Sequence, residues 1–293
     1  MSEGAAGVQP AASARLSLAA AEPFAAALYL AAGLQPHMAH SVARLQVLTD
    51  AMGRRTHGLA MAPLYLAELA KGGMAKSGAP VVVQDNGLCA VWGGGYLPGL
   101  WLVEHAIQML IPRAEKHGMA AVAIRRSHHI GCLAALAKQA ADQGLVVQMA
   151  NPDPTGQRVA PYGGTEALFT PNPYAFGYPL SADTSDNPVL VDICASITTT
   201  SMTGQRVAAG ERFEHPWLLD ADGQPTRDPA VLEHCLPAAR LLCSRCSIWR
   251  RPVVPTGRRT ANNPCVCPAT PLRATRRGCK SRAWCLRAPP GRR

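Results

Sequence analysis

The stretch Met119–Met149, MAAVAIRRSHHIGCLAALAKQAADQGLVVQM, decides the fold class. Its apolar start, from Met119 to Ile124, has the length and composition of a buried strand, and Leu145 to Met149 resembles a second one. Between them, Gly131 to Gln143 is rich in helix-forming Ala and Leu and stops at Gly144, a common residue after a helix end. A strand, a helix and a second strand in this short space predict an α/β fold.

The flanking segments extend this prediction with the same periodic patterns. Helices are expected at 17–32, from Pro36 to Gly53, at 63–71 and at 100–117. Short strands at 81–83 and 89–92 are joined by the turn residues Asp85-Asn86-Gly87. Beyond Pro152 we expect loops, strands at 174–178 and 188–193, and a short helix begun by residues 226–229.

The last 54 residues differ in charge from the rest of the chain. Residues 240–293 hold 14 of the 29 Lys and Arg residues and none of the 19 Asp and Glu residues, so residues 1–239 carry 15 basic and 19 acidic residues. The formal charge of +10 therefore resides in the tail, and it does not indicate that the folded part binds nucleic acid or a membrane.

The same tail has no pattern that predicts a fold. Seven prolines and six of the ten cysteines lie there, without an apolar period of 2 or 3.6. We therefore predict disorder for 240–293 and for the small, polar residues 1–14, with one domain at 15–239.

Nothing in the sequence indicates export or a membrane span. The apolar run at 24–34 is too short to cross a bilayer, and it follows Glu22 and Pro23 rather than basic residues. The cysteines of the predicted domain are widely spaced, as in reduced proteins. We expect a soluble protein of the cytoplasm.

Two histidine segments could carry chemistry. Ser127-His128-His129-Ile130-Gly131 follows a strand, where α/β sheets place ligands, and an imidazole can give or take the proton that accompanies hydride transfer to a carbonyl. In Arg55-Thr56-His57-Gly58, a hydroxyl, an imidazole and a guanidinium could hold a carboxylate. On spacing alone, the first segment could instead be a helix start or an exposed loop, and the second a solvated turn.

Other motifs point to no further chemistry. The glycine cluster at 93–99 is not a dinucleotide fingerprint, because Pro98 takes the place of the third glycine and no acidic residue follows at the required distance. The Cys243/Cys246 and Cys265/Cys267 pairs lack a second Cys-x-x-Cys spacing, so we predict no metal site. The tail has too few aromatic residues to favour nucleic-acid binding.

Taken in order, the motifs resemble the malate/L-lactate dehydrogenase family that lacks a Rossmann fold, which includes ureidoglycolate, sulfolactate and malate dehydrogenases and piperideine-2-carboxylate reductases. The matching segments span residues 17–239. They are Thr56-His57-Gly58 with Tyr65, Arg126 to Gly131, Val159 to Gly164, Asn172-Pro173, Val191-Asp192 with Ser196, and Trp217 to Pro229.

The resemblance implies a fold, a cofactor and site residues. The fold would be α/β with a mixed sheet and an N-terminal helical segment, in a homodimer that uses NAD or NADP. His129 would be the proton donor and acceptor, and Thr56 and His57 would lie on the substrate side. Cofactor contacts would fall on two stretches and one single residue, namely Asn151-Pro152-Asp153, Asp192-Ile193-Cys194 and Asn172.

The sequence also departs from the family pattern. Met61 stands where the family often has an arginine, so Arg55 or Arg126 would have to bind the carboxylate, and Pro171 stiffens a loop expected at the cofactor. Beyond residue 238 the family's glycine- and lysine-containing segment is replaced by Arg, Pro and Cys. We hypothesise a frameshift there, with a divergent basic extension as the rival; the genomic sequence decides between them.

The prediction is therefore an NAD(P)-dependent oxidoreductase acting on a small 2-hydroxy acid, its 2-oxo counterpart or a cyclic imino acid. Two alternatives stay open: an impaired, truncated remnant that still dimerises, and a nucleic-acid-binding protein that uses its basic tail.

Overall fold

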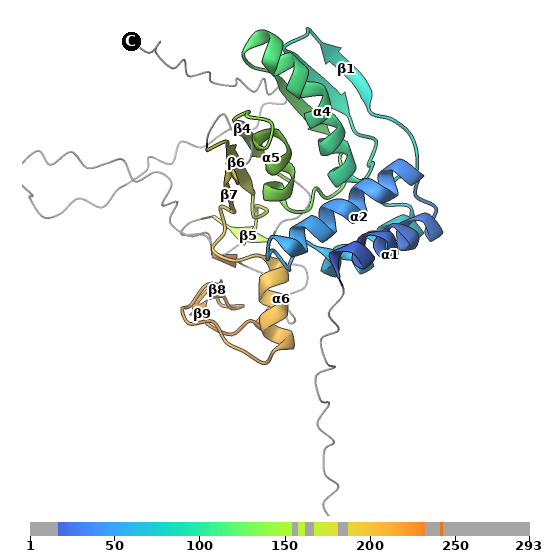
Figure 1. Ribbon diagram of the computed structural model, residues 1–293. Helices are drawn as coiled ribbons and strands as arrows, with labels where there is room; N and C mark the ends of the chain where they lie inside the picture. The colour runs from blue at the N-terminus through green and yellow to red at the C-terminus, as the bar shows by residue number, and fades with distance from the viewer. Residues whose placement is uncertain (1–16, 154–157, 162–166, 181–186, 232–240, 243–293) are drawn as a thin grey trace, which may run out of the picture. The chain divides into compact units, whose positions relative to one another are not determined.

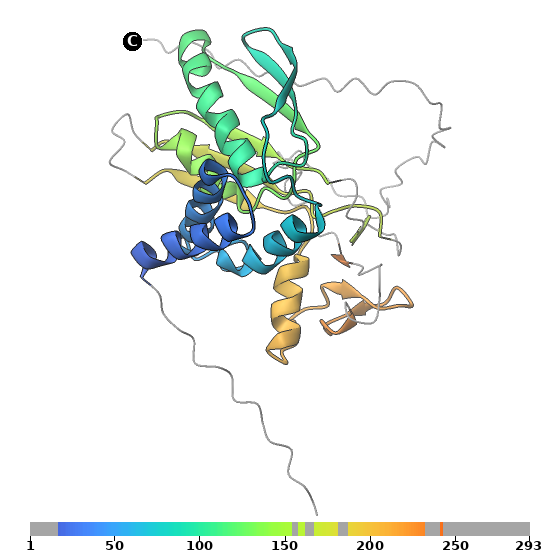
Figure 2. The ribbon, with the colours of Figure 1, turned by 90° about the vertical axis from the view of Figure 1, so that its right-hand side faces the viewer.

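The computed structural model describes residues 17–153, 158–161, 167–180, 187–231 and 241–242 (Figures 1 and 2). All of them belong to one unit, Met1–Trp249. The elements are α1 (Leu18–Ala31), α2 (Pro36–Ala51), η1 (Leu59–Met61), α3 (Ala62–Lys71), β1 (Val81–Asp85), β2 (Cys89–Gly93), α4 (Gly99–His117), β3 (Ala121–Arg125), α5 (Leu133–Ala141), β4 (Val147–Ala150), β5 (Val159–Ala160), β6 (Tyr174–Tyr178), β7 (Val189–Ile193), α6 (Thr200–Ala208), β8 (Leu218–Leu219), β9 (Pro225–Thr226) and β10 (Leu241–Leu242).

The N-terminal helices form because their ends carry suitable residues and their inner faces are apolar. Ser17 caps α1 by accepting a hydrogen bond from the backbone N–H of Ala20, and α2 has Pro36 in its first turn. Tyr29 and Leu45 are buried in the largest core cluster. The hydroxyl of Tyr29 donates to Gln46 at 2.6 Å, which satisfies a buried polar group between α1 and α2.

The first sheet has the order β1-β2-β3, with β1 antiparallel and β3 parallel to β2. Helix α4 packs on it through Leu102 and Ala106, against Val122 and Ile124 of β3 (Figures 1 and 2). The strand, helix and strand predicted within 119–149 are present as β3, α5 and β4, although β4 belongs to the second sheet.

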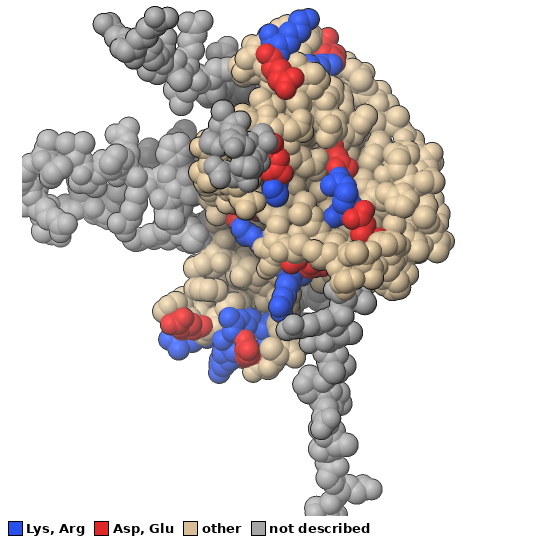
Figure 3. All heavy atoms as spheres, viewed as in Figure 1, with Lys and Arg blue, Asp and Glu red and all other residues tan. Residues whose placement is uncertain are grey.

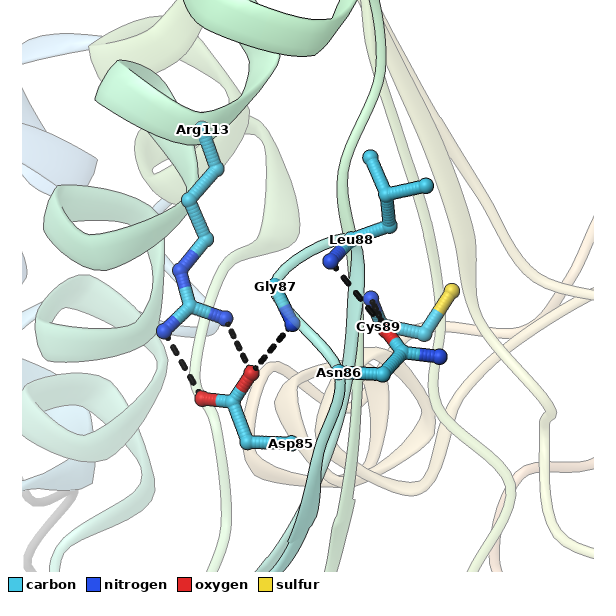
Figure 4. A network of polar contacts seen from close by, with 6 residues as sticks. All are labelled: Asp85, Asn86, Gly87, Leu88, Cys89 and Arg113. Atoms are coloured by element: carbon cyan, nitrogen blue, oxygen red, sulfur yellow. Dashed lines mark hydrogen bonds and ion pairs between the residues drawn. The ribbon is translucent and has the colours of Figure 1, made fainter.

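A polar network ties the β1–β2 turn to α4 (Figure 4). Both guanidinium nitrogens of Arg113 donate to the Asp85 carboxylate at 2.7 Å, and the side chain of Asn86 accepts from the N–H groups of Leu88 and Cys89. Gly87 has φ +86°, a conformation that glycine adopts without strain. The Arg113 guanidinium holds the pKa of Asp85 below its usual range.

The second sheet is antiparallel, in the order β4-β6-β7, and α5 packs beside it. A small third sheet has the order β5-β10-β8-β9, in which β10 is parallel to β5. Parallel and antiparallel pairs therefore both occur, which confirms the predicted α/β fold with mixed sheet pairing. Strand β10 lies within the segment 240–293; the rest of that segment and residues 1–14 lie outside the described residues.

Two expectations about elements need correction. Strand β3 was expected to be buried, but alternate residues are exposed because, among the described residues, no strand pairs with its outer edge. Helix α6 was not predicted: its threonines favour helices weakly, and Thr199 starts it by capping Met202. After β9 and a turn at 229–230, Val231 is helical, where the short helix begun by residues 226–229 was expected; residues 232–240 lie outside the described part.

One face of the molecule carries charges of both signs. On the face in Figure 3, the coloured acidic and basic side chains form small groups of both signs. Within the described part of the chain, no helix is both long and apolar enough to span a bilayer.

Candidate active site

The loop from Arg126 to Gly131 connects β3 to α5 and holds His129 against the start of α4. Its path depends on Gly99, since a Cβ atom there would lie 2.2 Å from the carbonyl oxygen of His128 and 2.5 Å from that of His129. Both Arg126 and Gly131 have positive φ, at +56° and +63°. The backbone N–H of Tyr96 donates to the carbonyl of Arg126 at 2.7 Å, which offsets part of the strain. The loop is therefore fixed by backbone contacts.

The Nδ1 atom of His129 has two hydrogen-bond neighbours. It lies 2.9 Å from the hydroxyl of Tyr65, a fully buried residue of α3, and it accepts from the N–H of Gly131 at 3.3 Å. Because a backbone N–H can only donate, this contact favours the neutral tautomer that carries its proton on Nε2. The Tyr65 hydroxyl also lies 3.1 Å from the carbonyl oxygen of His129.

A second histidine is stacked on the first. The rings of His57 and His129 have centroids 5.8 Å apart and planes inclined by 15°. The Nδ1 atom of His57 lies 2.8 Å from the hydroxyl of Thr56, so it too is oriented by a hydroxyl. The turn that carries both residues is held by Asp50, whose carboxylate accepts from the N–H of Leu59 at 2.8 Å. Chain segments from α2 and from the β3–α5 loop thus bring two imidazoles together.

Both imidazoles favour the neutral form. Burial, followed by the neighbouring His57 and His128, lowers the pKa of His129 to about 4, and Asp153 opposes this shift. Burial also lowers the pKa of His57, while the charge of Asp192 counteracts it. At neutral pH the pair is therefore uncharged, able to donate and accept hydrogen bonds at the ring nitrogens.

A cavity of about 200 Å³ lies beside His57, and His129 touches it only through the stacked His57 ring, because His129 is not among the described lining residues. Its lining includes His57, Thr56 and Arg54 from the end of α2, and Asp192, Ser196 and Thr198 from β7 and the chain after it. This volume is below the roughly 300–1,000 Å³ of typical ligand pockets. It can hold a small acid, with a guanidinium and hydroxyls for its oxygen atoms, but not a dinucleotide.

Asp192 connects this cavity to α5. Its carboxylate accepts from the N–H of Ala134 at 3.0 Å, in the first turn of α5, and lies 3.5 Å from the thiol of Cys132. The carboxylate thus caps the helix and suits its positive N-terminal end. Burial raises the pKa of the Cys194 thiol to about 11, with a contribution from Asp192, so this cavity thiol is neutral at pH 7.

The residues expected to contact a cofactor collect at one end of the β4-β6-β7 sheet. Because neighbouring strands of this sheet are antiparallel, the last residue of β4, the first of β6 and the last of β7 lie at the same end of the sheet. The N–H of Asn151 accordingly donates to Pro173 at 3.1 Å, and the N–H of Asp153 donates to the hydroxyl of Thr170 at 3.3 Å. That hydroxyl donates to Asn172, which has φ +45°.

These groups fit the nicotinamide end of a cofactor. The amide of Asn172 and the hydroxyl of Thr170 stand at the sheet end, and Asp192 and Cys194 extend that end into the cavity. Amides and hydroxyls are suitable partners for the carboxamide of nicotinamide.

The predicted substrate residues do not all meet. Thr56 and His57 line the cavity, whereas Arg55 and Arg126 are exposed and do not. The neighbouring Arg54 lines it instead, and the sequence offered no means of choosing between two consecutive arginines in a turn.

Some residues of the candidate site were not assigned a role from the sequence. They are Tyr65, which hydrogen-bonds to His129, and Ser196 and Thr198, which line the cavity. His128, beside the candidate catalytic residue, instead lies 3.4 Å from Glu68 through its Nε2 atom. In the described ranges, no group of three or more His, Cys, Asp or Glu side chains could hold a metal ion. The tail cysteines considered for zinc fall outside those ranges.

Known proteins share this fold. Residues 16–243 match the family model described as malate/L-lactate dehydrogenase. The chain therefore belongs to the malate/L-lactate dehydrogenase family, as the resemblance predicted.

Two curated relatives are named for different activities. The chain is 31% identical over 225 residues to (2R)-3-sulfolactate dehydrogenase (NADP+) from Chromohalobacter salexigens, covering 76% of this chain and 66% of that enzyme. It is 31% identical over 217 residues to ureidoglycolate dehydrogenase (NAD+) from Escherichia coli O157:H7, covering 71% of this chain and 58% of that enzyme. The chain thus spans less than two thirds of the length of both.

A solved structure supports the same relationship. The Δ1-piperideine-2-carboxylate reductase from Pseudomonas syringae pv. tomato superposes with a TM-score of 0.72 and 26% identity, covering 78% of this chain and 67% of that one.

Proposed function

We propose that this protein is an NAD(P)-dependent oxidoreductase that interconverts a small 2-hydroxy acid and its 2-oxo counterpart, or acts on a cyclic imino acid. The observation that carries the proposal is the stacked His57–His129 pair, each ring held at Nδ1 by a hydroxyl, in which His57 lines a cavity of the size of a small acid. The relatives are named as dehydrogenases and reductases of such compounds, and the names of the two dehydrogenases include NADP+ and NAD+.

In this proposal Arg54 and Thr56 bind the carboxylate of the substrate and place its carbonyl or hydroxyl carbon near the imidazoles. When bound, the nicotinamide supplies or accepts the hydride at that carbon. Asn151, Asn172 and Asp192 are the candidate residues for positioning it, together with Pro152, Asp153, Ile193 and Cys194 of the same two segments. The role of Arg55 and Arg126 would be secondary, because neither is among the residues that line the cavity.

His129 would move the proton. In the reductive direction the ring, protonated on both nitrogens by solvent, donates its Nε2–H to the oxygen of the substrate and is left neutral with its proton on Nδ1. In the oxidative direction this neutral ring accepts the hydroxyl proton at Nε2. Tyr65 can accommodate the resting ring and both of these forms: its hydroxyl donates to an unprotonated Nδ1, and it accepts from Nδ1–H while donating to the carbonyl of His129, 3.1 Å away. Tyr65 is thus a positioning residue.

The test is oxidation of NADH and NADPH with a panel of 2-oxo acids and cyclic imines. His129→Ala should lower kcat/KM by about 10²–10⁴-fold, as expected for loss of a general acid–base group. Tyr65→Phe should lower kcat by about tenfold with little change in KM, because one hydrogen bond to the imidazole is lost. Tyr96→Phe, at an exposed tyrosine, is the matched control. Turnover by His129→Ala equal to that of the wild type would remove His129 from the mechanism.

A catalytically impaired family member is the second candidate. A titration that follows NADH and NADPH fluorescence distinguishes the two: the enzyme binds the cofactor saturably, and an impaired protein does not. We also propose a homodimer in the cytoplasm. Sedimentation velocity of the full chain tests the dimer, and cell fractionation tests the compartment.

A further inference from the structure

Two adjacent histidines of the β3–α5 loop pack against one tyrosine. The ring of Tyr65 lies 6.0 Å from the ring of His128 and 5.8 Å from that of His129, between centroids, with planes inclined by 77° and 83°. Among the described residues, however, the Tyr65 hydroxyl hydrogen-bonds only to His129, at Nδ1 and at the carbonyl oxygen. Another contact must therefore keep the His128 ring away from that hydroxyl.

Helix α3 provides this contact. Glu68 follows Tyr65 by three residues, so the two side chains lie on the same face of the helix. The Oε2 atom of Glu68 lies 3.4 Å from Nε2 of His128, and these side chains are only 17% and 14% exposed, so water competes weakly for the contact. One face of α3 thus offers a hydroxyl to His129 and a carboxylate to His128.

The surroundings of Glu68 hold its carboxylate in this position. Its Oε1 atom lies 2.7 Å from Nζ of Lys71, and this hydrogen bond keeps the pKa of the Glu68 carboxyl below its usual range, against the opposing effect of burial. The chain after α3 leaves room for Oε2, because a Cβ atom at Gly73 would lie only 2.2 Å from it. Glu68 is therefore ionised at neutral pH and faces His128.

The His128 ring depends on Glu68 because it has no second polar partner. Its Nδ1 atom is buried and, within the described part of the chain, has no hydrogen-bond partner. If the contact with Glu68 were lost, the ring would have no polar partner at all, which is unfavourable for a buried group. The Tyr65 hydroxyl, on a ring that already packs against His128, would then be an alternative partner.

We propose that Glu68 is a positioning residue of the candidate site: by holding the His128 ring at Nε2, it reserves the Tyr65 hydroxyl for the neighbouring imidazole. Glu68 thereby determines that His129, rather than His128, exchanges the proton with the substrate. The consequence for turnover rests on the proposed function, whereas the contacts between the rings do not. Glu68 itself touches neither substrate nor cofactor in this account.

Ring ¹⁵N NMR of the full chain, labelled at its histidines, tests the contacts without turnover, because the shift of a ring nitrogen reports whether it carries a proton. In the wild type, Nδ1 of His129 should be unprotonated and accept a hydrogen bond. Glu68→Ala should shift this resonance, because His128 then competes for the Tyr65 hydroxyl. Glu68→Gln keeps an acceptor oxygen and should restore the wild-type resonance. Glu115→Ala, at an exposed position on α4, is the matched control and should leave it unchanged.

Steady-state kinetics on a substrate from the panel of 2-oxo acids and cyclic imines tests the effect on the reaction. Glu68→Ala should lower kcat by about tenfold or more and leave KM within about twofold, because Glu68 orients the proton carrier and not the substrate. Gly73→Ala keeps the charge but displaces Oε2 of Glu68, so it should lower kcat in the same way. Glu115→Ala should leave both constants within about twofold.

Three results would overturn the inference. The first is a wild-type Nδ1 resonance of His129 in both Glu68→Ala and Gly73→Ala. The second is an equal shift in Glu68→Gln and Glu68→Ala, which would mean that no acceptor oxygen holds the ring. The third is a loss of kcat in His128→Gln as large as that in His129→Ala, which would make His128 the proton carrier. If the wild type had no turnover while Glu68→Ala still shifted the resonance, the proposed function would fail and the inferred contacts would stand.

Discussion

Lowering the pH from 7 towards 4 should destabilise this protein, and His129 should be a main cause. Burial and the neighbouring imidazoles lower the pKa of His129 to about 4, whereas in the unfolded chain it returns to about 6.5. The unfolded state then binds the proton more tightly than the folded state. Stability associated with neutral His129 is therefore fully present above pH 6.5 or so, and is lost progressively as the pH falls towards 4.

The magnitude follows from the shift. A difference of about 2.5 pKa units, at about 1.4 kcal/mol per unit, corresponds to roughly 3 kcal/mol. Net stabilities are only about 5–15 kcal/mol, so the loss is large enough to measure. The pKa of His57 is lowered as well, and its protonation adds to the loss in the same direction.

Urea unfolding, followed by circular dichroism at several pH values, measures this effect. His129→Gln should lose most of the pH dependence between about 6.5 and 4, because glutamine does not titrate. His40→Gln, at an exposed position on α2, should keep it. If His129→Gln showed the same slope as the wild type, the buried neutral imidazole would be the wrong explanation.

Two further substitutions test how the site is held. Gly99→Ala should lower the free energy of unfolding, measured in urea, by more than about 2 kcal/mol, because the new Cβ atom would lie 2.2 Å from the carbonyl oxygen of His128. The control Gly204→Ala, in open space on α6, should raise it by about 0.5–1 kcal/mol. Equal effects of the two substitutions would refute the close approach at Gly99. Asp192→Ala should lower the free energy of unfolding in urea by about 1 kcal/mol, because the N–H of Ala134 at the start of α5 loses its acceptor. Asp192→Asn keeps an acceptor oxygen and should lower it by less. An equal loss in both variants would show that this hydrogen bond does not stabilise α5.

Local sequence patterns predicted most of the elements before residue 151. The α2 pattern ends near Gly53, and the turn glycine Gly87 marks the β1–β2 hairpin, because these signals act within a few residues. Later elements were harder to predict. The two-residue strands β5, β8 and β9 are too short for any period, and α6 depends on a threonine cap and on packing rather than on propensity.

For the candidate site, the sequence indicated some of the residues but not how they are arranged in space. The resemblance assigned His129 and His57, but nothing in the spacing of these residues indicates that their rings stack. The choice of Arg54 over Arg55 for the cavity is made by the direction of a turn. The Tyr65–His129 contact joins residues 64 positions apart, so no local pattern could reveal it.

By itself, the sequence determined the α/β class, the early helices and strands, the basic tail and the chemical types available at the site, since composition and short periods encode these properties. Only the tertiary structure decided that two imidazoles meet, that their burial keeps them neutral, and that β3 and β4 belong to separate sheets. These properties depend on distances between segments and on exclusion of water, which arise when distant parts of the chain pack together.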